Sequence, residues 1–184
     1  MYLKSVPKVD SIDEIVEIER RLSKAYFAGK LEKELKKIQK EKNFKNPIYY
    51  KVEDWIENKE KYDEYNKDRK SGHDTKVSID KEVGYWRKFN ALHSWFVNTF
   101  QDGVDECQQS IVDPEVLKEL LYKLATINKK NVKDVLPTQK GFFFGGTDYD
   151  EYFWQDVEEF RIYLLNLLAD NDFEEITLIY RASW

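Results

Sequence analysis

The chain has 184 residues, of which 41% are hydrophobic, 15% aromatic and 35% charged. Disordered chains are poor in aromatic residues, so this composition excludes global disorder and predicts one domain with a sizeable core. The net charge of −5 argues against general nucleic-acid binding, which requires a basic excess to displace counterions.

Signals for export or membrane insertion are not found in this sequence. Cys107 is the only cysteine, so no internal disulfide can form, which fits a reducing cytosol. The first ten residues lack the apolar segment of a signal peptide, and no run approaches the ~20 apolar residues of a membrane span. We therefore expect a cytoplasmic protein without a membrane partner.

The N-terminal region is highly charged and mainly helical in its predicted elements. Ser11 and Glu14 form a capping-box pattern that predicts a helix over residues 11–28. Three further elements are predicted: a short helix or arm over residues 31–42, a strand over residues 48–52 and a surface helix over residues 53–70. We expect residues 1–75 to form a helical, charged region or arm.

Residues 76–184 are predicted to form a compact core, joined with the N-terminal region in one domain. Hydrophobic periodicity and capping residues predict helices over residues 81–100, 114–127 and 149–169. A small sheet is expected from residues 76–79, 142–144 and 173–181, and the helix over residues 11–28 is expected to complete the core. The predicted fold class is α+β, a predominantly helical single domain with a small β-sheet.

Polar residues on the helix over residues 81–100 are the first candidates for a site. Opposite the apolar arc lies a stripe of mostly uncharged groups: Arg87, Asn90, Ser94, Asn98 and Gln101. Such a stripe suits a helix that faces a ligand or another backbone, although an ordinary solvated face is the alternative. His93, within the apolar arc, suits a general base or metal ligand, or else a hydrogen-bonded core histidine.

Acidic residues cluster at two helix ends. Asp102 and Asp105 follow a helix C-terminus, where carboxylates oppose the helix dipole, so they are candidates for Mg²⁺ binding or acid–base chemistry. Asp148, Asp150 and Glu151 precede a helix, where the dipole accounts for them. With two histidines and one cysteine, a zinc site is poorly supplied, and no metal site is predicted.

A loop of glycines and aromatic residues supplies further candidates. Thr138, Gln139 and Lys140 precede the aromatic residues 142–144, which glycines flank. Glycines permit close backbone approach and aromatic rings stack on bases, whereas the alternative is a short buried strand. The segment lacks the Walker and dinucleotide-binding patterns.

The end of the chain is the last candidate segment. Its residues Arg181, Ser183 and Trp184 follow a predicted strand, and the terminal aromatic ring suggests an end that is docked on the core, a pocket or an oligomer interface. We expect the polar stripe, the loop over residues 138–140 and this end to converge around a shared cavity or contact patch.

A resemblance extends over about residues 80–184. It is carried by the segments 85–97, 101–105, 136–145, 148–152 and 180–184, which begin with Tyr-Trp-Arg-Lys-Phe-Asn and end with Tyr-Arg-Ala-Ser-Trp. These segments resemble an uncharacterised family of small proteins encoded in tailed-phage and prophage genomes. The resemblance implies a phage accessory protein that acts inside a bacterial cell, against host defence, and it supplies no catalytic residue.

Three functions follow as hypotheses. The first is a non-enzymatic protein without cofactor, which binds a host defence protein or a nucleotide-like small molecule through the candidate residues. The second is a hydrolase of phosphate esters that uses His93, Asp102 and Asp105 with a divalent metal. The third is a structural role through homo-oligomerisation, driven by the surplus of aromatic residues.

Overall fold

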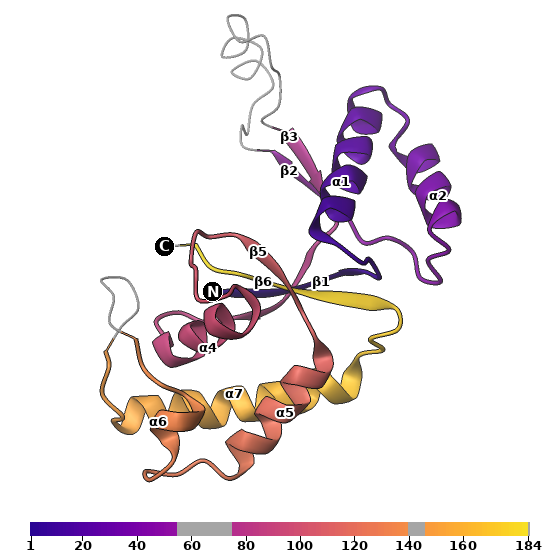
Figure 1. The fold of residues 1–184 in the computed structure, drawn as a ribbon. Coiled ribbons are helices and arrows are strands. Elements are labelled where there is room, and N and C mark those ends of the chain that lie inside the picture. Colours follow the sequence, from indigo (N-terminus) through magenta and orange to yellow (C-terminus); the bar gives the residue numbers. More distant parts are fainter. Residues whose placement is uncertain (55–74, 140–145, 184) are drawn as a thin grey trace, which may run out of the picture. The chain divides into compact units, whose positions relative to one another are not determined.

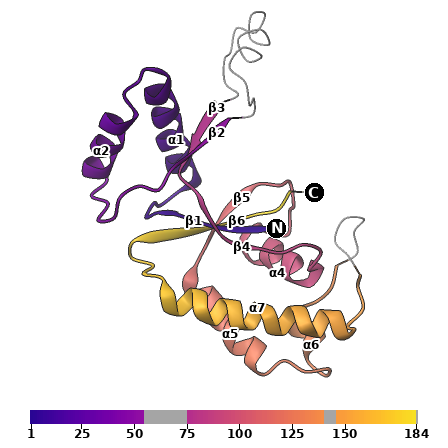
Figure 2. The ribbon, with the colours of Figure 1, turned by 180° about the vertical axis from the view of Figure 1, so that it is seen from behind.

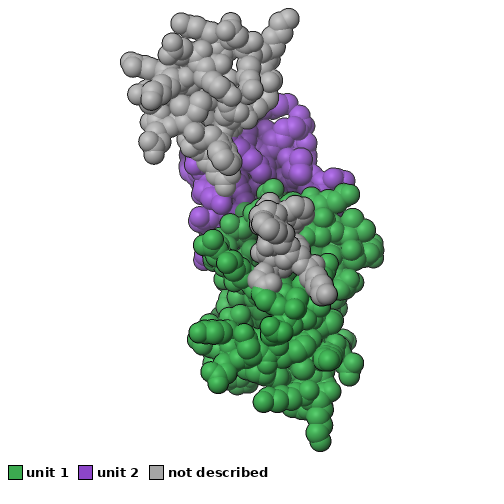
Figure 3. Space-filling model, turned by 90° about the vertical axis from the view of Figure 1, so that its left-hand side faces the viewer, with its two compact units in different colours: residues 1–5, 82–184 green, residues 6–81 purple. Residues whose placement is uncertain are grey.

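A computed structural model describes residues 1–54, 75–139 and 146–183. The fold is α+β with more residues in helices than in strands, which confirms the predicted class. The chain divides into two compact units: residues 1–5 with residues 82–184 form unit 1, and residues 6–81 form unit 2 (Figure 3). No helix of the described residues is both long and apolar enough to cross a bilayer.

The larger sheet has four strands in the order β4-β1-β6-β5. Their bounds are Lys81–Tyr85 for β4, Tyr2–Pro7 for β1, Ile176–Arg181 for β6 and Gln109–Val112 for β5. β5 runs antiparallel to β6, with Ser110 opposite Tyr180. Met1 and Trp86 exchange backbone hydrogen bonds of 2.9 and 3.0 Å, the reciprocal pattern of an antiparallel pair, so β1 and β4 run antiparallel here.

Four helices of unit 1 lie on one side of this sheet (Figures 1 and 2). They are α4 (Asn90–Phe100), α5 (Pro114–Ala125), α6 (Val132–Val135) and α7 (Glu151–Asp170). The core between them and the sheet includes Leu92, Phe96, Leu117, Leu120, Phe160, Leu164, Leu178 and Tyr180. The predictions over residues 114–127 and 149–169 are thereby confirmed as α5 and α7.

Side-chain caps explain where these two helices begin. The Asp113 carboxylate accepts the Glu115 N–H at 2.8 Å, and Pro114 occupies the first turn. The Asp150 carboxylate accepts the Phe153 N–H at 2.9 Å. Both contacts satisfy N–H groups that have no partner within the helix.

The single helix predicted over residues 81–100 is wrong in its first half. Residues 81–85 form β4, and α4 begins only at Asn90. Lys88 has φ of +65°, which interrupts a helix. A Cβ on Gly84 would lie 2.4 Å from Trp86 Cη2 and 2.6 Å from Tyr163 Oη, so aromatic side chains pack directly on this strand. The local pattern could not reveal this, because the pairing that makes residues 81–85 a strand is with β1, far away in the sequence.

The described residues of unit 2 form a helical pair and a two-stranded sheet. Its elements are α1 (Ile12–Phe27), α2 (Leu31–Glu41), β2 (Lys51–Asp54) and β3 (Thr75–Ser78). The Ser11 hydroxyl accepts the Glu14 N–H at 3.2 Å, as the capping pattern predicts, and Gly29 ends the first helix with φ of +65°. α1 packs against both α2 and β3. The predicted first helix, the short second helix and the strand near residues 76–79 are confirmed.

The predicted composition of the sheet is wrong. β3 pairs with β2, with Lys51 opposite Ser78, whereas the C-terminal strand β6 lies between β1 and β5 in the other sheet. Helix α1 does not join the core cluster of unit 1 but packs on β3 in unit 2. Of the helix predicted over residues 53–70, residues 53 and 54 belong instead to β2 and the remainder lies outside the described residues, as does the predicted strand over residues 142–144.

Candidate functional site

Helix α4 carries the candidate residues Asn90, His93 and Ser94, with Gln101 at its C-cap, and all four are buried. Its apolar side chains Leu92 and Phe96 are fully buried in the core. The Phe96 ring stacks on the ring of Tyr180 in β6, with centroids 4.2 Å apart and planes within 3°. This contact fixes α4 against the sheet, so polar residues of α4 that share the buried surface must find partners inside the protein.

His93 finds two such partners. Its Nε2 lies 2.9 Å from Asp105 Oδ2, and its Nδ1 lies 2.6 Å from the hydroxyl of Tyr180. Since a carboxylate only accepts, the proton is assigned to Nε2, and Nδ1 accepts from the phenol. Burial lowers the pKa of His93, opposed by the attraction of Asp105, and burial raises the pKa of Tyr180. The three groups therefore form a hydrogen-bonded chain in which the neutral imidazole of His93 joins the Asp105 carboxylate to the Tyr180 phenol.

The loop after α4 holds Asp105 in place. Its other carboxylate oxygen accepts the Cys107 N–H at 3.4 Å. The Gln108 side chain donates to the Val104 carbonyl and accepts the Glu106 N–H, both at 2.6 Å. Asp102, Gly103 and Cys107 all have positive φ, so the turn is tight. This geometry directs the Asp105 carboxylate toward His93.

Gln101 closes the polar end of α4 against β5. Its Nε2 donates to Ser110 Oγ at 2.7 Å and to the Gln108 carbonyl at 3.1 Å. Its Oε1 is buried and has no hydrogen-bond partner among the described residues. Ser94, also buried, accepts a hydrogen bond of 3.2 Å from Asn98. Gln101 thus links the end of α4 to β5 and to the loop before it, whereas the contact of Ser94 with the exposed Asn98 lies within α4.

Asn90 joins the N-terminal end of α4 to the loop candidates. Its side-chain oxygen accepts the Gln139 N–H at 3.2 Å, and its amide group donates to the carbonyl of Gly146. The Thr138 hydroxyl donates to the Thr147 carbonyl at 3.0 Å. Of the polar stripe, Asn90 contacts this loop, at the backbone of Gln139 and Gly146, whereas Thr138 bonds to Thr147 and Tyr149.

Other predicted residues lie apart from these contacts. Arg87, Asp102, Arg181 and Ser183 are exposed and contribute no side chain to the hydrogen bonds just described. Lys140 and Trp184 lie outside the described residues. The sequence-based set is thus divided between a buried network around α4 and isolated surface positions.

The buried network is poorly suited to metal chemistry. Both ring nitrogens of His93 are engaged, so neither offers a lone pair to an ion without loss of a hydrogen bond. Within residues 1–54, 75–139 and 146–183, no group of three His, Cys, Asp or Glu side chains is placed to hold a metal ion. The hydrogen bonds of this network connect α4 with β6 and with the loop over residues 101–108.

The outer surface of α7 has the opposite character, and the sequence analysis did not single it out. Residues 148–175 contain ten Asp or Glu and one Arg, a net charge of −9 in a chain whose total is −5; five of these acidic residues lie on α7 and five in the segments that flank it. The single arginine, Arg161, forms an ion pair of 2.6 Å with Glu158. Burial, and after it the negative charges of Glu159 and Asp150, raise the pKa of Asp156.

Large apolar side chains are exposed on the same helix. Tyr152 is 78% exposed, Leu165 51% and Ile162 48%. Ile162 and Leu165 are three residues apart, which places them side by side on the face opposite the buried Phe160 and Leu164. The sequence could have indicated this surface by the high density of acidic residues over residues 148–175. The helix dipole explains acidic residues only in the first turn of a helix.

Comparisons of this chain with known proteins identify no relative. No protein-family model, no curated protein and no solved structure matches this chain. The class of the protein is accordingly given by its own structure: an α+β fold with a buried polar network at α4 and an acidic, partly apolar surface on α7.

Proposed function

We propose that this chain is a phage accessory protein that binds a basic protein of the bacterial host, rather than an enzyme. The observation that carries this proposal is the surface of α7 and its flanking segments, where an excess of carboxylates and large exposed apolar side chains occur together. The context of phage and host comes from the sequence resemblance, and the chemistry of the partner comes from this surface.

The charge of the surface argues for a cationic partner. With ten acidic residues and one paired arginine over residues 148–175, the region attracts Lys- and Arg-rich surfaces and repels anions. A nucleotide-like ligand, the other partner considered from the sequence, carries phosphates and would be repelled here. Charge complementarity thus favours the protein partner over the nucleotide.

The apolar side chains argue for a protein surface rather than for free cations. Protein interfaces gain most of their affinity from a few large side chains, among which aromatic residues are enriched. Tyr152, Ile162 and Leu165 are exposed groups of this kind on α7, the helix that also carries the acidic residues. A partner with basic residues around an apolar patch would complement both features.

The phage context suggests what such a partner does. Host proteins that act on nucleic acid carry basic surfaces that neutralise phosphates. An acidic helix could occupy such a surface and exclude the nucleic acid, which would counter a defence that acts on phage DNA or RNA. The proposal therefore predicts competition between this chain and nucleic acid for the same partner.

The test is capture from a nuclease-treated lysate of a bacterial host, followed by mass spectrometry of proteins and small molecules. The test variant neutralises α7 by Asp156→Asn with Glu159→Gln. The matched control, Glu106→Gln with Glu119→Gln, removes two exposed carboxylates of unit 1 outside α7. We expect a basic protein that wild type and control retain, that the α7 variant retains about tenfold less, and that added duplex DNA displaces.

Several results would contradict the proposal. Equal retention by the α7 variant and the control would remove α7 from the interaction. A nucleotide released intact on heating would favour the small-molecule ligand. Turnover of a phosphate ester that requires Mg²⁺ and fails in Asp102→Ala would favour the hydrolase, and a mass that rises with concentration without any partner would favour a structural role.

A further inference from the structure

The exposed face of α2 carries a row of lysines. Residues 30–45 contain seven Lys and three Glu, a local net charge of +4 in a chain whose total is −5. With about 100° between successive residues of a helix, four exposed lysines of α2 fall within an arc of about 100°. This lysine row consists of Lys33, Lys36, Lys37 and Lys40. The negative total charge argues against a basic surface over the whole chain, but not against this local one.

Helix α2 packs on unit 2 through its opposite face. Leu35 and Ile38 are buried, and α1 lies between α2 and β3 (Figures 1 and 2). Because the apolar side of α2 is covered in this way, the helix cannot lay that side into a lipid bilayer. The lysine row remains on the outside.

The carboxylates of α2 are neutralised mainly from α1. Arg21 forms ion pairs of 2.7 Å with Glu34 and 2.8 Å with Glu41. Lys37 approaches Glu41 at 3.7 Å, an exposed pair of little strength. The other three lysines of the row form no ion pair within the described residues, so their charges are available to an anion.

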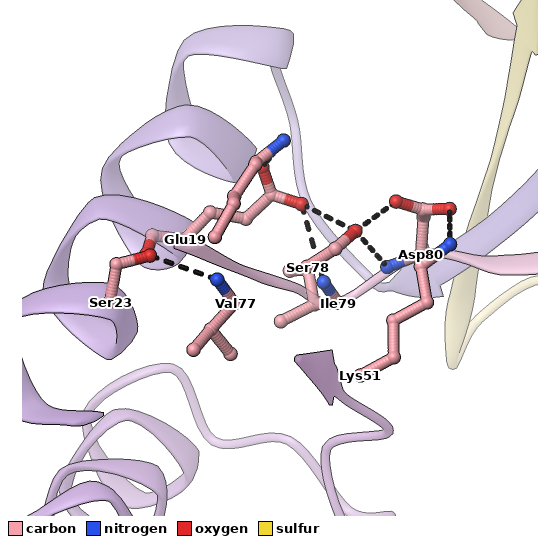
Figure 4. Close-up of polar contacts among 8 residues, drawn as sticks. Glu19, Ser23, Lys51, Val77, Ser78, Ile79 and Asp80 are labelled. Atoms are coloured by element: carbon pink, nitrogen blue, oxygen red, sulfur yellow. Dashed lines mark hydrogen bonds and ion pairs between the residues drawn. The ribbon is translucent and has the colours of Figure 1, made fainter. Parts of the chain in front are cut away.

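Two buried carboxylates of unit 2 are also compensated inside it (Figure 4). Glu19 of α1 forms an ion pair of 2.6 Å with Lys76 and accepts the Ile79 N–H at 3.2 Å. Asp80 pairs with Lys51 at 3.2 Å. The contacts of Glu19 fix α1 on β3, so the lysine row of α2 rests on a fixed support.

Two exposed aromatic rings lie at the turn that leads into α2. Tyr26 and Phe27 end α1, and Phe27 is 51% exposed. Gly29 has φ of +65°, and the Lys30 N–H donates to the Ala25 carbonyl at 2.8 Å, which reverses the chain at once. The two rings therefore lie next to the end of α2 at which the lysine row begins.

The segment before β2 brings a further ring to the same end of α2. The Tyr50 hydroxyl donates to Glu32 Oε1 at 3.4 Å, in the first turn of the helix. Glu32 and Lys36 are four residues apart, so they are neighbours on the helix surface. Tyr49, next to Tyr50 in the chain, is exposed. Lysines and exposed rings thus occur together on this side of unit 2.

We infer that this surface of unit 2 binds single-stranded nucleic acid. The lysine row contacts the phosphates, and the rings of Phe27 and Tyr49 stack on unpaired bases. A duplex offers only its phosphates, because its bases are already stacked on one another. Every base has a face on which a ring can stack, so we expect little sequence preference. This inference does not depend on the proposed partner of α7, which belongs to unit 1.

The test measures binding of the full chain to a labelled oligothymidine of about 16 nucleotides by fluorescence anisotropy. The test variant replaces three lysines of the row: Lys33→Gln, Lys36→Gln and Lys40→Gln. The matched control removes the same charge from exposed positions of unit 1: Lys123→Gln, Lys129→Gln and Lys130→Gln.

The lysine variant should lose both affinity and salt dependence. We expect wild type and control to bind with a Kd on the order of 10⁻⁵ M, and the variant to bind about tenfold less tightly. Each neutralised phosphate of a single strand contributes about −0.7 to the slope of log K against log salt concentration. The slope of the variant should therefore be smaller by about 2.

The rings are tested separately from the charges. Phe27→Ala with Tyr49→Ala should weaken the binding of oligothymidine about tenfold and leave the salt slope unchanged, because rings contact bases rather than phosphates. Tyr122→Ala, which removes an exposed ring of α5, is the matched control and should bind as wild type does.

Three results would overturn the inference. The first is equal binding of oligothymidine by the lysine variant and its control. The second is a duplex of the same length bound as tightly as the single strand, with the ring variant unchanged. The third is binding to vesicles of phosphatidylserine and phosphatidylcholine that oligothymidine does not displace, which would assign the surface to a membrane. The α7 variant Asp156→Asn with Glu159→Gln should bind oligothymidine no more weakly than wild type, which separates this test from that of the proposed function.

Discussion

Helices α4 and α7 belong to the same unit, yet they use their polar residues in opposite ways. On α4, Asn90, His93 and Gln101 are buried and satisfied mainly by other parts of the chain. On α7, carboxylates face solvent next to exposed apolar side chains. Asn90, His93 and Gln101, whose residue types suggest a reactive site, thus hold the fold together, whereas the interface that we propose consists of ordinary acidic and apolar residues on α7.

This comparison changes what each helix should tolerate. Buried hydrogen-bonding groups cost free energy when a partner is removed, because the remaining group is left without water or protein. Exposed groups lose little on substitution. Substitutions on α4 should therefore change stability first, and substitutions on the outer face of α7 should change binding with little effect on stability.

The largest expected effect is that of His93→Leu. The apolar side chain leaves the buried Tyr180 hydroxyl and the Asp105 carboxylate without their shared partner, so we expect a loss of about 2–4 kcal/mol in the free energy of unfolding. Asn166→Leu, at an exposed position of α7, is the matched control and should stay within about 0.5 kcal/mol of wild type. Urea denaturation measures both, and equal values would remove the contrast between the helices.

Gly84→Ala should have the next largest effect and tests where α7 meets the sheet. The new Cβ would lie 2.4 Å from Trp86 Cη2 and 2.6 Å from Tyr163 Oη, so ring displacement should cost about 1–3 kcal/mol. Gly146→Ala, where no atom lies within 4 Å of the new Cβ, is the control and should be nearly neutral. Thermal unfolding compares the two, and a neutral Gly84→Ala would contradict this packing.

The free energy of unfolding should depend on pH through the titration of the buried His93 imidazole. Because burial lowers the pKa of His93, the folded state binds its proton less tightly than the unfolded state, in which imidazole titrates near about 6.5. Its contribution to stability is complete above that pH and is lost as the pH falls through the folded pKa. The urea concentration at the midpoint of unfolding should therefore fall as the pH is lowered below about 6.5. In His93→Gln the midpoint should depend less on pH over the same range.

The smallest expected effect is a gain in stability for Asp156→Asn. The pKa of Asp156 is raised, so the folded state holds its proton more tightly, and ionisation at neutral pH costs stability. Removing the charge should stabilise the fold by less than about 1 kcal/mol at neutral pH, and the gain should vanish below about pH 4, where both states are protonated. A loss of stability at neutral pH would show that the carboxylate has a compensating cation.

Much of the fold could be predicted from local patterns. Capping residues such as Ser11 and Pro114, together with apolar periodicity, located α1, α5 and α7 because helix hydrogen bonds join residues close in sequence. The strands β1 and β5 were missed, and residues 81–85 were assigned to a helix. Strand pairing depends on partners far away in the chain, such as Met1 with Trp86, which local periodicity does not report.

The candidate site was predicted in part. The proposed meeting of α4 with the loop near residue 138 occurs at Asn90, but Asn90, Ser94 and Gln101 of the stripe are buried, and Arg87 and Asn98 alone are exposed to solvent. Burial is set by what packs on a helix, and the partners of His93 come from β6 and from the loop after α4. The composition of residues 148–175 reveals their excess of acidic residues, but only the structure shows which side chains of α7 are exposed.

By itself the sequence determined the α+β class, three long helices and their caps, and the excess of negative charge, since these depend on composition and on neighbours within a few residues. Only the tertiary structure decided which polar groups are buried and which edge of β3 is covered by α1. Those properties arise from contacts between segments far apart in the chain, where close packing and hydrogen-bond satisfaction select one arrangement among many.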